Sequence, residues 1–370
     1  MDLFVYGTLR SAALLEVVAG EAVEAVAADL PGYAVHPVAG DCVPLIAEAP
    51  GATTAGLLVK GLSQQAMMRL DLYEGAFGYS LTPVQVLVAG VGQGAQVYLP
   101  PVAQEAGEGV WSLADWEAEH LAPALLAAGE LFSRDPLPDH ATARQLWAMI
   151  ERRAWAQHRA AQRHRPSERR HAARPGDLTI EGRRPPAGSF FALQSFDLRH
   201  RQFDGNDSEV LSREVFWGTD AALVLPYDPV SDRVLLVEQA RMGPALLGEA
   251  NPWVLEPIAG MVDARETPED CALRETREET GIAEIMLERI AAFYPSPGSS
   301  TDYFHAYVGL CRLGDETRLS GGVAEEAEDL RLHPLAFEEA MALVESGEIA
   351  AGPLVMMLYW LALNRARLRG

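Results

Sequence analysis

Three glutamates at helical spacing are the residues of this chain best suited to do chemistry. Glu275, Glu278 and Glu279 stand at positions i, i+3 and i+4 of one stretch. Thr267 before this stretch suits a helix N-cap, and Gly281 after it supplies a C-terminal stop. These signals predict a helix of about 13 residues on which the three carboxylates share one face.

Two interpretations of this acidic face are open. On a solvated face the carboxylates repel one another by only a few tenths of a kcal/mol per pair, so an exposed acidic helix is tolerable. In a partly closed cleft, charges about 6 Å apart at an effective dielectric near 20 repel by roughly 3 kcal/mol per pair. A divalent cation would remove that repulsion, and hard oxygen ligands suit magnesium or manganese.

A longer pattern surrounds the three glutamates. Residues 260–282 match the Nudix box, GX5EX7REUXEEXGU, at every fixed position, with Thr276 in a slot that prefers an apolar residue. Seven accidental matches have odds on the order of 10⁻⁵ or less at ordinary residue frequencies. The segment therefore resembles the Nudix hydrolases. This resemblance implies an α/β/α sandwich, metal-assisted hydrolysis of a nucleoside diphosphate derivative, and a structural ion pair between Glu266 and Arg274.

The segments on either side of the box extend the resemblance over residues 190–365. EQARMG (238–243) and PWVLEPIAG (252–260) precede the box, and FYPSPGSSTDYFHAYVG (293–309) and GGVAEEAEDLRLHPL (321–335) follow it. This arrangement is similar to the ADP-ribose pyrophosphatase branch of the Nudix hydrolases. It implies that ADP-ribose, or a related nucleoside diphosphate sugar, is hydrolysed to AMP and ribose 5-phosphate.

The same resemblance implies a set of metal ligands. Glu275 and Glu279 would hold the cation, with Glu279 also counted among the catalytic residues. Glu278 would share the cation or support the other ligands, and the Ala259 carbonyl would be a backbone ligand. Mg²⁺ is the expected cofactor, with Mn²⁺ as the alternative.

Residues that contact the substrate or activate water follow from the resemblance too. Arg241 and Glu256 stand where the family contacts the phosphates and the adenine side of ADP-ribose. The water-activating glutamate of the family lies on a loop that matches VAEEAEDL, where Glu326 is the best candidate and Glu325 and Glu328 are rivals. A solvated acidic turn is the alternative interpretation of that loop.

A second candidate site lies near the N-terminus. The chain opens on LFVYGTLR, a short strand that runs into Gly7, where the backbone can turn tightly and expose amides as an anion cradle. Together with the later LDLYEGAFGY, this resembles the gamma-glutamylcyclotransferase-like, or AIG2-like, family, whose fold is a small mixed barrel. By that resemblance Tyr6, Gly7, Thr8 and Leu9 form the cradle for a glutamyl carboxylate, and Glu74 is the general base.

The N-terminal resemblance leaves two hypotheses. Many family members have an arginine where this chain has Leu81, so the conventional substrate does not follow. A glutamate acts as a base near neutral pH only if its pKa is raised, usually by burial, and an exposed turn is the alternative for Glu74. The domain either acts on gamma-glutamyl amines or peptides, or is a non-catalytic ligand-binding or regulatory module.

The chain length of 370 residues suits two domains. We expect an α+β protein with an N-terminal mixed β-barrel over residues 1–105, a helical, arginine-rich connector over 106–176, and a C-terminal α/β/α Nudix sandwich over 177–370. The first connector helix is expected to be interrupted at Pro123. Residues 151–174 hold eight arginines and two glutamates, which favours a solvated helix or linker; an RNA-contacting arm is the alternative.

Composition limits the setting and the partners. A net charge of −22 argues against general nucleic-acid binding, and the apolar runs are far below membrane-spanning length. No positively charged leader precedes the first strand, and three cysteines form neither a metal spacing nor an even framework, so we expect a cytoplasmic protein. By resemblance we also expect a homodimer, in a setting like that of tellurite-resistance-associated members of the branch.

Overall fold

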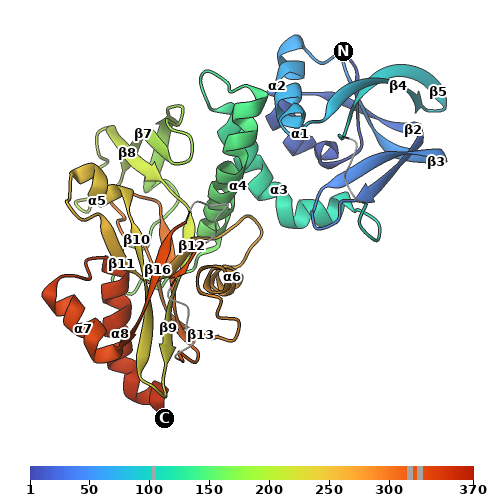
Figure 1. The fold of residues 1–370 in the computed structure, drawn as a ribbon. Coiled ribbons are helices and arrows are strands. Elements are labelled where there is room, and N and C mark those ends of the chain that lie inside the picture. The colour runs from blue at the N-terminus through green and yellow to red at the C-terminus, as the bar shows by residue number, and fades with distance from the viewer. Residues whose placement is uncertain (102–105, 315–319, 323–327) are drawn as a thin grey trace. The chain divides into compact units, whose positions relative to one another are not determined.

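The computed structural model describes residues 1–101, 106–314, 320–322 and 328–370. It consists of two compact units, Met1–Arg213 and Glu214–Gly370 (Figure 1). In the described residues, no helix is both long enough and apolar enough to cross a membrane.

The N-terminal unit is built on a closed five-stranded barrel with the order β1-β3-β2-β4-β5. Its strands are β1 (Leu3–Val5), β2 (Glu24–Pro37), β3 (Pro44–Lys60), β4 (Ser80–Val88) and β5 (Val91–Leu99). β1 runs parallel to β5 and antiparallel to β3, which makes the barrel mixed. The predicted small mixed barrel is thus confirmed. A short 3₁₀ helix, η1 (Thr8–Arg10), and the helices α1 (Ala12–Ala19) and α2 (Gln64–Gly75) accompany it.

Two long helices, α3 (Leu113–Phe132) and α4 (His140–Gln162), pack on the barrel helices. Trp116 and Ala128 of α3 enter the hydrophobic cluster that contains α1. The expected interruption of α3 is wrong, because the helix runs through Pro123. Pro123 removes one backbone hydrogen bond, and its buried position lets packing offset that loss.

One arginine of the basic segment is not solvated. Arg153 of α4 is fully buried and donates to both carboxylate oxygens of Glu130 on α3, at 3.0 and 2.6 Å. It also donates to the Phe190 carbonyl at 3.2 Å. The pair therefore ties the two helices to the chain that follows them. A separate three-stranded sheet comes next, formed by β6 (Leu178–Arg183), β7 (Ala192–His200) and β8 (Leu211–Trp217).

The C-terminal unit contains an eight-stranded mixed sheet with the main order β13-β14-β9-β10-β16-β15, to which β11 and β12 add through β10 and β9. Its strands are β9 (Asp220–Asp228), β10 (Arg233–Ala240), β11 (Trp253–Glu256), β12 (Ile258–Met261), β13 (Met286–Phe293), β14 (Tyr303–Leu310), β15 (Ser320–Gly321) and β16 (Leu330–Ala336). Its helices are α5 (Met242–Leu247), α6 (Pro268–Thr280), α7 (Phe337–Ser346) and α8 (Gly352–Arg369).

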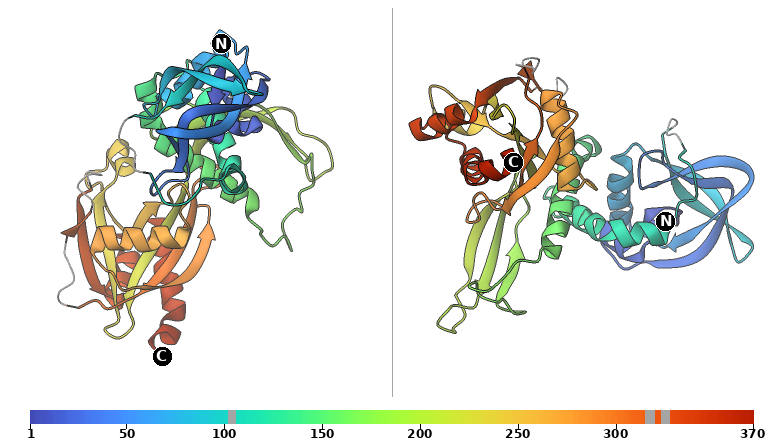
Figure 2. Two further views of the ribbon diagram at one scale, coloured as in Figure 1. Left: turned by 90° about the vertical axis from the view of Figure 1, so that its right-hand side faces the viewer. Right: turned by 90° about the horizontal axis from the view of Figure 1, so that it is seen from below.

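Alternation along the central strands explains the layers of this unit. Ala222 and Val224 of β9 pack in one cluster with Cys271 and Ala272 of α6. Their neighbours, such as Leu223, face the opposite side and pack with α7 and α8. Because successive side chains of a strand point to opposite faces, each face needs its own helical cover. The views in Figure 2 show α6 on one side of the sheet and α7 and α8 on the other. The predicted α/β/α sandwich is confirmed.

Candidate active site

Local signals build the helix that carries the three glutamates. The Thr267 hydroxyl accepts from the Asp270 amide at 3.1 Å, and Pro268 occupies the first turn. Gly281 ends the helix in the left-handed region, at φ 74°. The predicted helix of about 13 residues is confirmed by α6, whose bounds are Pro268–Thr280.

The three glutamates differ in environment. Glu279 is 2% exposed, whereas the side chains of Glu275 and Glu278 are 13% and 41% exposed. Glu275 lies against the backbone of β12, where a side chain at position 260 would overlap its carboxylate, so Gly260 is required by close approach. The acidic face is therefore partly enclosed, and only Glu278 fits the solvated interpretation.

Arg274 binds three carboxylates at once. It donates to both oxygens of Glu266, at 2.9 and 3.0 Å, which confirms the predicted ion pair. One of its nitrogens, Nη1, also donates to Glu275 at 2.6 Å and to Glu278 at 3.0 Å. Arg274 therefore neutralises part of the cluster, and it does so for every box glutamate except Glu279.

Glu279 is the buried carboxylate of the box that lacks a full set of hydrogen-bond partners in the described residues. Its Oε1 accepts from the Ala259 amide at 3.4 Å, and its buried Oε2 has no hydrogen-bond partner in the described part of the chain. Burial raises the pKa of Glu279 to about 9, and the charges of Glu328 and Glu275 add to the effect. Burial also raises the pKa of Glu275. A buried, unpaired oxygen beside other acids is a place where a cation would lower the free energy.

These donors suit a hard divalent cation in their chemistry, since they are carboxylate and carbonyl oxygens. Glu279 and Ala259 lie together on α6 and β12, and Glu275 is their close neighbour. Within the residues that the structure describes, no three acidic, histidine or cysteine side chains already form a metal cage. Arg274 accounts for part of this, because it holds Glu275 and Glu278.

One rival base candidate lies beside the cluster. Glu328 is close enough to raise the pKa values of both Glu275 and Glu279. Its backbone packs against Gly322, which has a φ of +99°. Glu325 and Glu326 lie outside the described residues.

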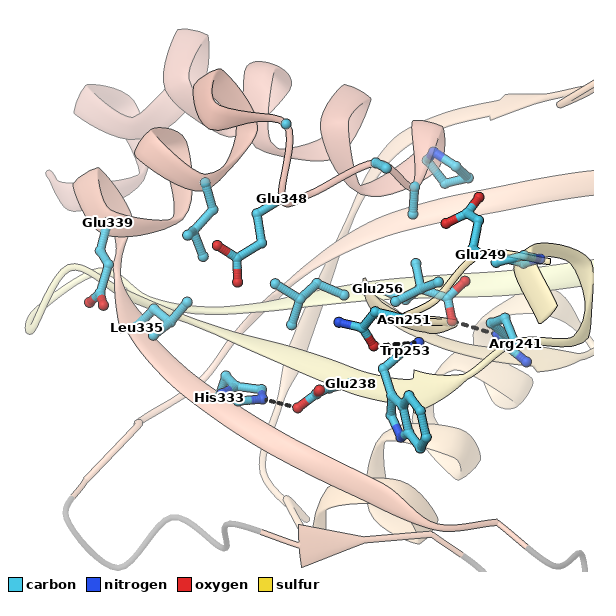
Figure 3. A pocket seen from close by; sticks show the side chains of 18 residues that line it. Glu238, Arg241, Glu249, Asn251, Trp253, Glu256, His333, Leu335, Glu339 and Glu348 are labelled. Carbon is cyan, nitrogen blue, oxygen red and sulfur yellow. Dashed lines mark hydrogen bonds and ion pairs between the residues drawn. The ribbon is translucent and has the colours of Figure 1, made fainter. Parts of the chain in front are cut away.

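Arg241 and Glu256 form an ion pair at one end of a cavity. Arg241 Nε donates to Glu256 Oε2 at 2.6 Å, and both residues line a cavity of about 840 Å³ (Figure 3). The charge of Arg241 opposes the burial that raises the pKa of Glu279, so its guanidinium lies within electrostatic reach of α6. The sequence interpretation did not include two other lining residues, Trp253 and His333.

Of the N-terminal candidate residues, Tyr6 lies near Glu74. Burial raises the pKa of Glu74, in the last turn of α2, to about 7. Burial raises the pKa of Tyr6 as well, and the charge of Glu74 adds to that shift, so the two residues are neighbours. Leu9 is buried in the hydrophobic core beside α1, so only its backbone can face a ligand. A side chain at Gly7 would come within 2.8 Å of Pro44.

Comparisons with known proteins assign a family to a part of each half of the chain. The family model for the NUDIX domain matches residues 218–351, and that for gamma-glutamyl cyclotransferase, AIG2-like, matches residues 3–118. The ADP-ribose pyrophosphatase of Haemophilus influenzae is 39% identical over 197 residues, which are 52% of this chain and 89% of that protein. The ADP-ribose pyrophosphatase of Escherichia coli K12 is 38% identical over 195 residues, 52% of this chain and 91% of that protein.

One further relative and one solved structure are similar at lower identity. The GDP-mannose pyrophosphatase of Salmonella paratyphi B is 33% identical over 177 residues, 47% of this chain and 88% of that protein. A solved ADP compounds hydrolase covers 52% of this chain and 97% of its own, with a TM-score of 0.39 and 20% identity. The acidic helix and the three pyrophosphatase relatives define a hydrolase of a class that generally uses divalent metal ions. The chain belongs to the Nudix hydrolase family, and its N-terminal unit carries a domain of the AIG2-like type.

Proposed function

We propose that the C-terminal unit hydrolyses ADP-ribose, or a closely related nucleoside diphosphate sugar, to AMP and ribose 5-phosphate. The observation that carries this proposal is Glu279, a buried carboxylate with an unpaired oxygen beside Glu275 and Glu328 and within electrostatic reach of Arg241. This arrangement suits a site that receives both a cation and a diphosphate. The names of the relatives, which include ADP-ribose and GDP-mannose pyrophosphatases, support the substrate class.

Mg²⁺ is the cofactor that we propose, with Mn²⁺ as a substitute. Glu275, Glu279 and the Ala259 carbonyl would hold it, and Glu278 would assist at the exposed rim. Once bound, a divalent cation supplies charge neutralisation and Lewis-acid polarisation of the diphosphate. The chain carries a net charge of −22, so a diphosphate can approach only where cations oppose that field.

The chain's own residues bind and orient the substrate. Arg241 would donate charge-assisted hydrogen bonds to a phosphate, while its ion pair with Glu256 at 2.6 Å fixes the guanidinium. Arg274 donates hydrogen bonds to Glu266 and Glu275 and so fixes the positions of these carboxylates. We assign the proton transfer from the attacking water to Glu326, and Glu328 is the alternative base.

A hydrolysis screen tests this function. ADP-ribose, ADP-glucose, NADH and FAD would be incubated with Mg²⁺ and wild type, Glu279→Gln, or the control Glu284→Gln, which alters an exposed glutamate just beyond α6. We expect ADP-ribose to be the preferred substrate. We expect its turnover to be largely lost in Glu279→Gln and kept in the control. Robust turnover by Glu279→Gln would reject the metal assignment.

A second activity is favoured by one observation in the N-terminal unit. Glu74 has a pKa of about 7 and stands beside Tyr6, which suits a general base near neutral pH. We propose that it accepts the proton of a substrate α-amine while that amine attacks the γ-carbonyl, which releases an amine and 5-oxoproline. Incubation of gamma-glutamyl peptides with wild type and Glu74→Gln would detect this. Binding of these peptides without 5-oxoproline release would instead indicate a ligand-binding module.

The assembly and setting are proposals as well. We propose a homodimer, supported by exposed apolar side chains around β6 and β7, among them Leu178, Ile180 and Leu193. We propose a cytoplasmic setting, supported by three cysteines that form no even framework, and a stress role like that of tellurite-resistance-associated members. Light scattering of the purified protein would test the dimer.

A further inference from the structure

Helix α4 brings a titratable side chain onto α2, the helix that carries Glu74. His140 is the first residue of α4, and its Nε2 lies 3.2 Å from Asp71 Oδ2, with both side chains about half-exposed. The imidazole also lies against Gly75, where a Cβ atom would come within 3.0 Å of the ring. The AIG2-like match ends at residue 118. His140 is therefore supplied by a helix outside the part of the chain that matches that family.

Tyr98 connects this pair to Glu74. Tyr98 of β5 is 4% exposed, and its hydroxyl donates to Asp71 Oδ1 at 3.5 Å, a length that catalytic hydrogen bonds often have before substrate binds. Burial raises the pKa of Tyr98, and the charges of Asp71 and Glu74 add to the effect, so the hydroxyl lies near both carboxylates. Asp71 and Glu74 stand three residues apart on one face of α2. Together these side chains form a path from Glu74 to solvent at His140.

The proposed release of 5-oxoproline requires such a path. A substrate α-amine is mainly an ammonium group at neutral pH, and only the neutral amine has the lone pair that attacks the γ-carbonyl. Glu74 must therefore pass one proton to water before it accepts a second proton for the leaving nitrogen. A bound substrate occupies the space beside Glu74, so the first proton needs another way out.

We propose that Tyr98, Asp71 and His140 relay this first proton from Glu74 to solvent. This inference rests on the proposed 5-oxoproline-releasing activity of the N-terminal unit. Glu74 takes the proton from the ammonium group and gives it to the Tyr98 oxygen as the Tyr98 proton moves to Asp71. His140 Nε2 then accepts the proton from Asp71, and His140 releases it to water.

The freed lone pair completes the reaction. It forms the carbon–nitrogen bond of the lactam, and the second amine proton moves through Glu74 to the leaving nitrogen. The bond from the γ-carbon to that nitrogen breaks, and the amine departs. The relay residues move a proton without touching the substrate, so their loss should lower kcat and leave KM unchanged.

Release of 5-oxoproline from gamma-glutamylalanine and gamma-glutamylbutylamine by the full chain tests the relay. Wild type would be compared with His140→Ala, Tyr98→Phe and the control His164→Ala, which removes an exposed histidine just beyond α4. We expect kcat to fall roughly 10- to 100-fold in the first two variants, less than the 10²- to 10⁴-fold contribution of a direct proton acceptor. The control should match wild type.

Free imidazole distinguishes a relay from a structural role. It can enter the half-exposed space left by His140→Ala and restore most of kcat, whereas Tyr98→Phe is buried and should not respond. Unchanged kcat in both variants, or a loss in His140→Ala that imidazole does not reverse, would overturn the relay and leave the N-terminal activity intact. A wild type that releases no 5-oxoproline would overturn both.

Discussion

Replacing Glu279 by glutamine should stabilise the metal-free protein, and more so as the pH rises. Burial raises the pKa of Glu279 from its ordinary value of 4.5 to about 9. Because the folded-state pKa lies above that of the unfolded chain, folding must take up a proton at any pH between the two values. Glutamine occupies nearly the same volume and needs no proton.

The expected size follows from the two pKa values. The free-energy cost of protonating Glu279 on folding is absent below pH 4.5. It grows by about 1.4 kcal/mol per pH unit above that pH and levels off near the folded-state pKa. It is therefore roughly 3 kcal/mol at pH 7. The buried glutamine amide has unsatisfied hydrogen-bonding groups of its own, which cost about 1–3 kcal/mol. The variant should gain about 1–2 kcal/mol at pH 7 and more at higher pH.

Differential scanning calorimetry in EDTA, at about pH 5, 7 and 8.5, would measure this gain. The relevant transition is the one that Mg²⁺ shifts, and Glu284→Gln again serves as the exposed control. The advantage of Glu279→Gln should widen from the lowest to the highest pH and shrink when Mg²⁺ is added, because the cation stabilises wild type more. Parallel curves for wild type and variant would refute the argument, as would a wild type that is more stable at the highest pH.

Three further outcomes follow from other contacts. Arg153→Met should destabilise the N-terminal unit by roughly 1.5–3 kcal/mol, because the buried Glu130 carboxylate loses two charge-assisted hydrogen bonds and keeps the one from Arg134; chemical denaturation would measure it, and a loss under about 1 kcal/mol would contradict it. Arg274→Gln should lower the melting temperature of the metal-free protein far more than the control Arg277→Gln, an exposed residue of the same helix; equal shifts would disprove the central role of Arg274. If Glu74 is the base of the N-terminal site, 5-oxoproline release should rise with pH through about 7 and vanish in Glu74→Gln, and a pH-independent rate would count against it.

The parts of the fold that the sequence predicted well depend on local signals. Thr267 and Gly281 fix α6 without help from distant residues. The ion pair of Glu266 with Arg274 followed from resemblance, because Glu266 lies in the loop before the helix. The barrel and the sandwich followed from resemblance. Residues that share a helix or a turn can be placed by spacing alone, so the acidic face of α6 is evident in the sequence itself.

The features that the sequence did not predict depend on tertiary packing. Pro123 reads as a helix breaker, yet α3 continues because its surroundings bury it. In the sequence, Arg153 is one of several arginines expected to be solvated. In the structure it binds Glu130, which is distant in sequence. The exposure of Trp253 could not be predicted from the sequence either, since most tryptophans of this chain are at least half-buried. Such properties arise from contacts between distant segments.

The central claim is that the acids of α6 hold a divalent cation, and metal titration tests it most directly. Mn²⁺ would be titrated into EDTA-treated, dialysed protein by isothermal calorimetry, with wild type, Glu279→Gln and Glu284→Gln compared. The account predicts saturable binding to wild type and the control, and an affinity weaker by about 10-fold or more in Glu279→Gln, in line with the loss of one charged ligand. Equal Mn²⁺ affinity in all three proteins would contradict the account.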